Sequence, residues 1–481
     1  MLFNSLQFAV FFVIVFALYW LAGTRRLWLQ NTLLVVASYY FYCSWNWRFG
    51  LLLAFSTLLD FYSARAIAAS VRHKKAWLYT AITINLGLLA FFKYYNFFIS
   101  SAAQLLESFG FNANVYLLSV VLPVGISFYT FHGLSYVIDV YKGRISPTAN
   151  IVNYSLFVSF FPLLVAGPIE RATHLLPQIQ KPRAFDYPLA IIGMRQVLWG
   201  LFKKMVIADN CAYFVNHIFA NYQYQPASNL VFGAFLFSFQ IYGDFSGYTD
   251  IASGVSKLLG FNLLKNFNYP YFSRDIAEFW RRWHISLTSW FKDYVYIPLG
   301  GSRGSRFQTV RNVFIIFLVS GLWHGANFTF IAWGLLHAVY FLPLLLAGTN
   351  RKNTAIAAQG KIIPSFKEFI NIVVTFSLVT IGWIFFRSAT LPHAIGYCRR
   401  LFSPTLFSIP QFDNKPYALT VLLLVVAFIT AEWLGRESDF AIEKTAVTWP
   451  RPLRWLFYCI MVFLLILFMS FSEVPFIYFQ F

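Results

Sequence analysis

Charged residues are scarce in this sequence of 481 residues. Asp, Glu, Lys and Arg together make up 11%, whereas a soluble globular domain carries roughly 25%. No hydrophilic stretch is long enough to form a soluble domain of its own. Hydrophobic residues reach 59% and aromatic residues 21%. This composition is typical of a polytopic membrane protein, whose apolar faces meet lipid instead of water.

Cysteine is also rare, and several common catalytic motifs are missing. The four cysteines lie far apart in or beside apolar segments, with no CxxC pair and no metal-ligand spacing, so we predict neither disulfides nor a metal site. The sequence has no GxSxG, no Walker-type loop, no HExxH and no paired catalytic carboxylates. We therefore expect chemistry that needs no metal and no bound cofactor.

Acidic residues are outnumbered two to one, which leaves a net charge of +19. The basic residues are spread over short loops between apolar runs, a pattern that argues against nucleic-acid binding. The excess of Lys and Arg in cytoplasmic loops explains such a charge. An anionic substrate on the cytoplasmic side would be a second reason for it.

Apolar runs predict an all-α bundle of about 11 or more membrane helices. The predicted segments are 3–22, 28–46, 49–67, 77–98, 115–141, 154–169, 188–219, 228–245, 310–324, 328–347, 367–386, 416–434 and 455–472. Basic loops lie on both sides of 154–169, so we interpret this run as a re-entrant segment. Such non-helical backbone is tolerated where protein or a water-filled cavity covers it.

The loop charges predict a topology and a division of the chain. Basic loops near residues 25 and 70, and the basic segment 256–311, are expected inside, which places both termini outside. We expect one membrane domain over 1–481. It comprises N-terminal helices (1–110), a catalytic core (115–347), and C-terminal helices with an extracytoplasmic tail (366–481).

The segment "RDIAEFWRRWHISLTSWFKDYVYIPLGG" holds the first candidate residue, His284. On a helical wheel of 276–291, aromatic residues fall on one face and basic residues on the other, which predicts an interfacial amphipathic helix. His284 lies at the margin of the aromatic face. A ring that only hydrogen-bonds the backbone is the alternative to a functional role.

The segment "NVFIIFLVSGLWHGANFTFIAWG" holds the second candidate, His324. It follows Arg311 by thirteen residues, which is about 20 Å of helix in a hydrocarbon core about 30 Å thick. A histidine at such depth is a functional candidate. It can act as a general base toward a hydroxyl. Alternatively it is a core histidine satisfied by Ser320 or Asn327.

The segment "QIYGDFSGYTDIASG" places Asp244 and Asp250 among Gly, Ser and Tyr at the end of an apolar run. This pattern predicts a broken helix that lines a polar cavity and offers a proton or cation path. A structural hydrogen-bond cluster is the alternative. The same acidic residues would suit a transporter or flippase for a lipid-linked glycan precursor, although no inverted repeat is evident.

Six ordered segments resemble the membrane-bound O-acyltransferase (MBOAT) family, in its bacterial polysaccharide-modifying branch. They are LPVGISFYTFHGLSYVIDVYKG, FPLLVAGPIER, GLFKKMVIADN, YGDFSGYTDIASG, EFWRRWHISLTSWFKDYVYIPLGGSR and SGLWHGANFTFIAWG. The resemblance implies a multi-helix fold with a cytoplasmic funnel and tunnel. It makes His324 and His284 catalytic. The tunnel would be lined by Asp244, Ser246, Asp250, Trp323 and Asn327.

The resemblance also implies substrates and partners. The donor would be acetyl-CoA or another acyl thioester, such as an acyl-carrier protein, used as substrate and not as cofactor. Its phosphates need cations, and the candidates are Arg281, Arg282, Lys292, Arg303 and Arg306. The acceptor would be a polysaccharide such as alginate, cellulose or peptidoglycan, reached through an extracytoplasmic SGNH-type acyltransferase. The expected location is the bacterial inner membrane, among its lipids.

The chain finishes in PFIYFQF, which contains four aromatic residues and one hydroxyl, that of Tyr478. An interfacial aromatic anchor is one explanation. The tail also resembles a C-terminal aromatic-Tyr motif of bacterial glycan O-acylation systems, in which the Tyr accepts the acyl group. We therefore expect Tyr478 to be a third catalytic residue, which relays the acyl group after deprotonation by His324.

Overall fold

The computed structural model describes residues 1–23, 26–111, 117–118, 121–165, 167–469 and 476–477, and these contain helices and no strand. Six of the described helices are long and apolar enough to cross a membrane. They are α3 (Trp47–Ala69), α4 (Lys74–Ser108), α15 (Phe328–Leu346), α16 (Phe366–Arg387), α18 (Lys415–Gly435) and α19 (Arg451–Phe468). The predicted all-α membrane bundle is confirmed.

The chain groups into two units, which are residues Met1–Gly193 with Val255–Leu264, and Met194–Gly254 with Lys265–Phe481. Beside α3 and α4, the first unit contains α1 (Leu6–Leu21), α2 (Leu27–Cys43), α5 (Ile126–Tyr141), α6 (Ile151–Ser159), α7 (Phe161–Leu164) and α8 (Ala172–Ile179). Two helices contribute to both units, namely α9 (Tyr187–Leu201) and α11 (Ala227–Leu258).

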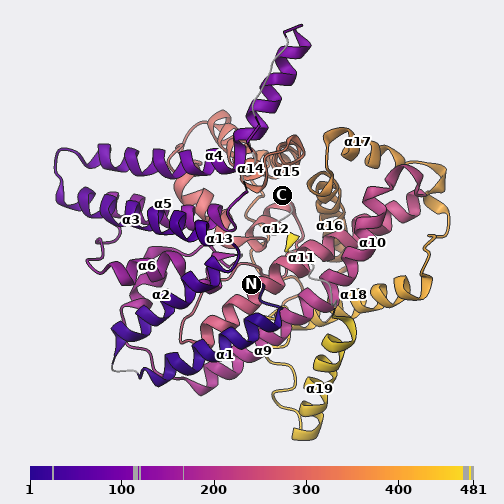
Figure 1. Ribbon diagram of the computed structural model, residues 1–481. Helices are drawn as coiled ribbons and strands as arrows, with labels where there is room; N and C mark the ends of the chain where they lie inside the picture. The colour runs from indigo at the N-terminus through magenta and orange to yellow at the C-terminus, as the bar shows by residue number, and fades with distance from the viewer. Residues whose placement is uncertain (24–25, 112–116, 119–120, 166, 470–475, 478–481) are drawn as a thin grey trace. The chain divides into compact units, whose positions relative to one another are not determined.

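Two features organise the first unit. The long helices α3, α4 and α5 pack on one another (Figure 1). Glu170 accepts hydrogen bonds from the backbone N–H of Leu264 (2.5 Å) and from His174 Nδ1 (2.8 Å), while its own N–H donates to His132 Nε2 (3.0 Å). In the predicted re-entrant segment, α6 and α7 are too short to cross a bilayer.

Beside α15, α16, α18 and α19, the second unit contains further helices. These are the π-helix η1 (Phe202–Ala208), α10 (Asp209–Ala220), η2 (Tyr222–Tyr224), η3 (Pro270–Phe272), α12 (Ile276–Arg282), α13 (Ile285–Phe291), the π-helix η4 (Lys292–Tyr296), α14 (Arg306–His324), α17 (Leu391–Arg400) and η5 (Pro404–Phe407). All of the candidate site residues belong to this unit.

The structure corrects two predictions about helix continuity. The single amphipathic helix expected over 276–291 is wrong, because the backbone breaks at His284 into α12 and α13. The break expected within 240–254 is also wrong, because α11 runs unbroken through this segment. Its glycines serve close packing instead. A Cβ on Gly243 would lie 2.9 Å from Lys203 O, and one on Gly247 would lie 2.8 Å from Gly200 O.

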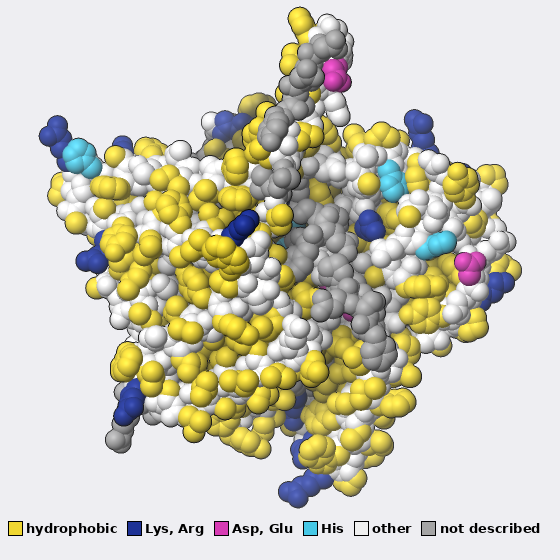
Figure 2. Space-filling view, in the orientation of Figure 1, with side chains coloured by type: hydrophobic (Ala, Val, Ile, Leu, Met, Phe, Trp, Pro, Cys, Tyr) yellow, Lys and Arg dark blue, Asp and Glu magenta, His cyan; other side chains and the backbone are white. Residues whose placement is uncertain are grey.

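Hydrophobic side chains cover most of the visible surface of the protein, and Lys and Arg are sparse there (Figure 2). Many of these exposed apolar residues lie on the spanning helices, such as Leu419 and Leu423 on α18 and Phe463 and Ile466 on α19. Water would disfavour so much apolar area, whereas lipid accommodates it. The protein is therefore a multi-pass membrane protein.

Candidate active site

His324 is the last residue of α14, and local sequence fixes both ends of this helix. α14 begins at Arg306 after a capping box, in which the Ser305 side chain accepts from Gln308 N–H and the Gln308 side chain accepts from Ser305 N–H. The helix ends after His324 because Gly325 is extended. A side chain at Gly325 would overlap an aromatic ring of α15. His324 thus has a defined position.

The backbones of α14 and α15 approach closely around this position. A Cβ on Gly321 would lie 2.3 Å from Phe330 O, and a Cβ on Gly334 would lie 2.4 Å from Phe317 O. Small residues permit such contact between membrane helices. Gly321 and Gly334 therefore serve the packing of α14 against α15.

Aromatic rings enclose His324, which is 4% exposed. Its ring centroid lies 5.1 Å from that of Trp333, 5.2 Å from that of Phe386 and 5.0 Å from that of Trp323. All three contacts are edge-on. The enclosure excludes water from the imidazole, which strengthens electrostatic interactions made there.

His284 occupies the break between α12 and α13, in the left-handed region at φ 44° and ψ 53°. Few residues other than Gly, Asn and Asp adopt this conformation, and it is costly for histidine. Such strain tends to occur at functional sites. The side chain is fully buried, so the predicted interfacial position of the ring is replaced by one inside the unit.

Asn266 orients the His284 ring. His284 Nδ1 lies 2.9 Å from Asn266 Oδ1. Since that amide oxygen also accepts from Ser286 Oγ (2.9 Å), it is an acceptor, and His284 Nδ1 carries the donated proton. Nε2 then presents its lone pair, and among the described residues it has no hydrogen-bond partner. This is the arrangement of a base held by an orienting group.

Burial lowers the pKa of His284 to about 3, so its ring is neutral near pH 7. A neutral imidazole with a free Nε2 can accept a hydrogen bond or a proton from a bound hydroxyl or thiol. The low pKa means that the protonated form is short-lived unless a negative charge develops beside it. His284 is therefore suited to brief proton transfer and to orienting a substrate.

The structure brings the two predicted histidines together through one indole. The Trp323 ring lies 5.8 Å from that of His284 and 5.0 Å from that of His324, in edge-on contact with both. Two motifs forty residues apart in the sequence thus meet in one buried aromatic cluster. The predicted tunnel residue Trp323 lies between them.

Replacing His284 with alanine or asparagine should lower acyl transfer by about 10²-fold or more, because both changes remove a buried imidazole whose Nε2 can accept a proton. Asparagine tolerates the left-handed backbone, so the His284→Asn protein separates loss of the ring from backbone strain. Turnover and donor KM would be measured on purified variants. Wild-type kcat with a raised KM would reassign His284 to donor binding.

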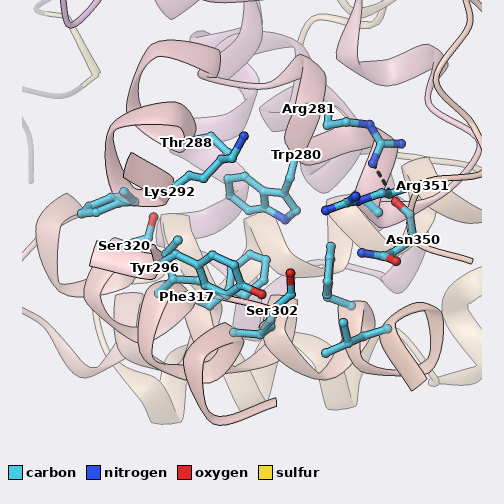
Figure 3. Close-up of a pocket in the computed structure, with 16 residues that line it drawn as sticks. Trp280, Arg281, Thr288, Lys292, Tyr296, Ser302, Phe317, Ser320, Asn350 and Arg351 are labelled. Atoms are coloured by element: carbon cyan, nitrogen blue, oxygen red, sulfur yellow. Dashed lines mark hydrogen bonds between the residues drawn. The ribbon is translucent and has the colours of Figure 1, made fainter. Parts of the chain in front are cut away.

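A cavity of about 510 Å³ lies beside this cluster (Figure 3). Its lining residues are Ala277, Trp280, Arg281, Thr288, Phe291, Lys292, Tyr296, Ser302, Val313, Ile316, Phe317, Ser320, Phe341, Leu345, Asn350 and Arg351. Figure 3 shows Trp280 between Lys292 on one side and Arg351 on the other. We call it the cationic cavity. Its size is typical of a small-molecule site.

The cationic cavity ends close to His324. Ser320, which lines it, precedes His324 by one helical turn on the same face of α14. The Trp280 ring lies 5.6 Å from that of Trp333, which in turn contacts His324. One layer of tryptophan therefore separates the cavity from the catalytic candidate.

All three lining cations are exposed, and two of them have neither an ion pair nor a hydrogen bond with the described residues. These are Lys292, at the start of η4, and Arg351, on the loop between α15 and α16. Arg281 also lines the cavity, but its guanidinium donates to the backbone carbonyls of Asn350 (2.8 Å) and Asn353 (2.7 Å). Arg281 thus holds the loop that presents Arg351.

The other predicted donor cations lie elsewhere. Arg282 is buried and donates to Glu278 Oε1 (2.9 Å) and to the carbonyl of Ala355 (3.0 Å). Arg303 and Arg306 are exposed residues outside the lining of the cationic cavity. Of the five predicted cations, the structure brings Arg281 and Lys292 to this cavity.

Replacing Lys292 and Arg351 together with alanine should raise the donor KM by about tenfold or more, because each change removes a charge-assisted contact to an anionic donor. The salt dependence of KM should weaken, while kcat changes little. The matched control is Arg303→Ala, which removes a cation outside the cavity. Equal KM values in the double variant and the control would show that the cavity cations do not bind the donor.

The predicted tunnel residues Asp244, Ser246 and Asp250 lie in a buried polar cluster beside η1. Lys204 Nζ lies 2.7 Å from Asp244 Oδ1, and Lys203 pairs with Asp250 and donates to Ser246 Oγ (2.9 Å). None of these residues lines the cationic cavity. The geometry matches the hydrogen-bond cluster that the sequence left as the alternative.

Two further predicted residues have different outcomes. Asn327 caps α15 by accepting from Thr329 N–H (3.0 Å), and it donates to Ala389 O (2.8 Å). Tyr478 lies outside the described residues. Its neighbours Phe476 and Ile477 are described and are buried in the second unit.

Sequence reasoning missed Asn266 and Arg351. Asn266 lies in "LKNFNYPY". Nothing in this stretch marks it as a residue that orients a histidine. Arg351 lies in a basic loop that the topology already explained by the positive-inside bias. Their roles depend on contacts with residues distant in sequence.

The model of the family described as MBOAT, membrane-bound O-acyltransferase family, matches residues 142–386. This range contains both histidines and the whole lining of the cationic cavity. The chain belongs to the membrane-bound O-acyltransferase family.

Three similar proteins have names that state the reaction they catalyse. A Pseudomonas aeruginosa protein named "probable alginate O-acetylase AlgI" is 40% identical over 92% of this chain and 82% of its own length. A Helicobacter pylori peptidoglycan O-acetyltransferase is 35% identical over 75% of this chain and 72% of its own. A Bacillus subtilis teichoic acid D-alanyltransferase is 30% identical over 56% and 70%. The chain is thus an O-acyltransferase, and the transporter alternative is not supported.

Proposed function

We propose that the chain takes an acetyl group from a thioester donor in the cationic cavity and passes it across the membrane for O-acylation of a polysaccharide. The observation that carries this proposal is the position of the cavity. It has unpaired cations at its rim and apolar walls, and it ends one helical turn from His324.

The chemical groups of a thioester donor match the side chains that line the cationic cavity. Acetyl-CoA and an acyl-carrier protein both carry a phosphate joined to a pantetheine arm. This arm can lie against apolar side chains, and it ends in the thioester. Lys292 and Arg351 would bind the phosphate, and the arm would lie along Trp280 and Phe317 toward Ser320.

His324 would act as the general base. It takes the proton of an acceptor hydroxyl as that oxygen attacks the thioester carbonyl carbon. The new C–O bond forms, the C–S bond breaks, and the thiolate leaves. The thiolate recovers the proton from the imidazolium, so His324 returns to its neutral form. His284, oriented by Asn266, would steady the thioester or assist this proton transfer.

The first acceptor in this proposal is Tyr478. Its acyl ester would then pass to the serine of an extracytoplasmic SGNH-type partner, which acylates the glycan. The names of the relatives point to alginate, peptidoglycan or teichoic acid as the class of final acceptor. The proposed location is the bacterial inner membrane, with both termini outside.

Deletion of the gene tests this proposal. The O-acetyl content of the secreted or wall polysaccharide should fall to background, and the wild-type gene should restore it. The gene carrying His324→Ala should be expressed at a normal level and fail to restore it. Unchanged O-acetylation in the deletion strain would refute the proposed function.

A further inference from the structure

We propose that Asp244 is the binding site for the backbone of the C-terminal segment, and that this contact anchors Phe476 and Ile477 beside His284. The proposal rests on the proposed function, because it assigns a site to the segment that contains Tyr478. It gives Asp244 a role other than lining a tunnel or relaying protons.

The central contact joins a buried carboxylate to a backbone amide. Ile477 N–H donates to Asp244 Oδ2 at 2.6 Å, and both residues are buried. A hydrogen bond to an ionised acceptor is stronger than one between neutral groups, and burial strengthens it further. Since the donor is a backbone N–H, this contact does not depend on which side chain residue 477 carries.

An aromatic pocket holds the preceding residue. Phe476 is fully buried, with its ring centroid 4.9 Å from that of Tyr248 and 5.8 Å from that of Phe245. Both rings belong to α11, where Phe245 directly follows Asp244 and Tyr248 lies one helical turn after Asp244. The site therefore contacts two groups of the segment, which are the aromatic side chain of Phe476 and the backbone N–H of Ile477.

The charge of the surrounding cluster favours a hydrogen-bond donor at Asp244. Lys204 Nζ lies 2.7 Å from both Asp244 Oδ1 and Asp209 Oδ1, so one ammonium serves two carboxylates. The neighbouring Lys203 is already paired with Asp250. This leaves carboxylate oxygen in excess, and a backbone N–H satisfies Asp244 Oδ2 without adding a further charge.

The π-helix η1 places the same region against the end of α19. Asn210 Nδ2 donates to the carbonyls of Met205 and Val206, in η1, and to that of Phe468, the last residue of α19 (3.3 Å). π-helical turns leave carbonyls available for such contacts and often mark functional sites. Contacts in this region therefore hold Phe468, at the end of α19, as well as Ile477.

The anchor lies one aromatic ring from the active-site cluster. Phe245, which follows Asp244 on α11, contacts Phe476 and also lies edge-on to His284, with centroids 4.7 Å apart. Fixing Ile477 here would therefore hold Phe476 and Ile477 close to His284, the residue proposed to steady the thioester or assist proton transfer. Loss of the anchor should reduce acyl transfer by loss of position, with the donor site intact.

The test measures exposure of the segment in the purified full-length chain. An Ile477→Cys substitution keeps the backbone N–H and adds a thiol, whose modification by a maleimide is followed by mass spectrometry of the C-terminal peptide. Adding Asp244→Asn should speed this modification by about tenfold or more, because it removes the charge on the acceptor.

The matched control is Asp250→Asn, which breaks a buried ion pair in the same cluster without touching the segment. It should leave the Ile477→Cys thiol as protected as in the otherwise wild-type chain. Equal modification rates in the Asp244→Asn and Asp250→Asn proteins would overturn the anchor, since the effect would then be general loosening. This readout needs no enzymatic activity, so it is independent of the proposed function.

A second measurement tests the link to catalysis. Asp244→Asn should lower acyl transfer to the polysaccharide at unchanged donor KM. Exposure of the thiol with unchanged transfer would refute the positioning role. Failure of the wild-type chain to transfer acyl groups would refute the proposed function itself.

Discussion

The His324→Ala protein should lose about 10²–10⁴-fold in acyl-transfer rate, the range expected when a general base is removed. The imidazole is enclosed by Trp323, Trp333 and Phe386, so no solvent molecule replaces it easily. Initial rates with a labelled thioester, measured on purified protein, give the size of the loss.

Two comparisons make this result specific to the base. His217 is an exposed histidine on α10, so His217→Ala should keep the wild-type rate. Alanine leaves a cavity among the three rings, so the melting temperature of His324→Ala should fall, and the rates are compared at a temperature at which both proteins stay folded. A loss of only a few-fold in rate would make His324 a packing residue.

The Tyr478→Phe protein should be unable to acylate polysaccharide, although it keeps the ring and any anchoring by it. A phenol is acidic enough for a histidine to deprotonate, and the phenolate is a good leaving group in the second transfer. O-acetyl content of the polysaccharide, with protein level as the reference, measures the effect.

Chemical evidence for the relay comes from the wild-type chain. When the extracytoplasmic partner is absent, mass spectrometry should find the acyl group on the C-terminal peptide, and Tyr478→Phe should abolish this adduct. Wild-type O-acetylation by the Tyr478→Phe protein would show that the segment serves only as an anchor.

The sequence identified the two histidines because their signals are local. The distance from Arg311 along an apolar run places His324 deep in the hydrocarbon core, and the basic-aromatic pattern marks the segment of His284. The sequence did not reveal the break at His284, since the amphipathic pattern continues across 276–291. At this break, Asn266 contacts the His284 ring from eighteen positions away, and its backbone carbonyl accepts from Ile285 N–H.

Arg281 and Arg282 show a second kind of information that the sequence alone does not provide, namely the partners of a charged side chain. Sequence gives the charge of Arg281 and Arg282 but not their partners, which include backbone carbonyls of the loop after α15 and, for Arg282, the Glu278 carboxylate. The glycines of α11 were similarly ambiguous. Gly243 and Gly247 indicated a broken helix, whereas the structure uses them for close contact with Lys203 of η1 and Gly200 of α9. Whether a glycine breaks a helix or permits packing depends on what faces it.

The most direct test of the account uses the purified wild-type chain in proteoliposomes, with acetyl-CoA labelled on the acetyl group as donor. We predict that the label moves to the chain or to an added acceptor while free CoA thiol appears in equal amount, and that neither occurs with His324→Ala. Thiol release without transfer of label, or equal transfer by the His324→Ala protein, would contradict the account.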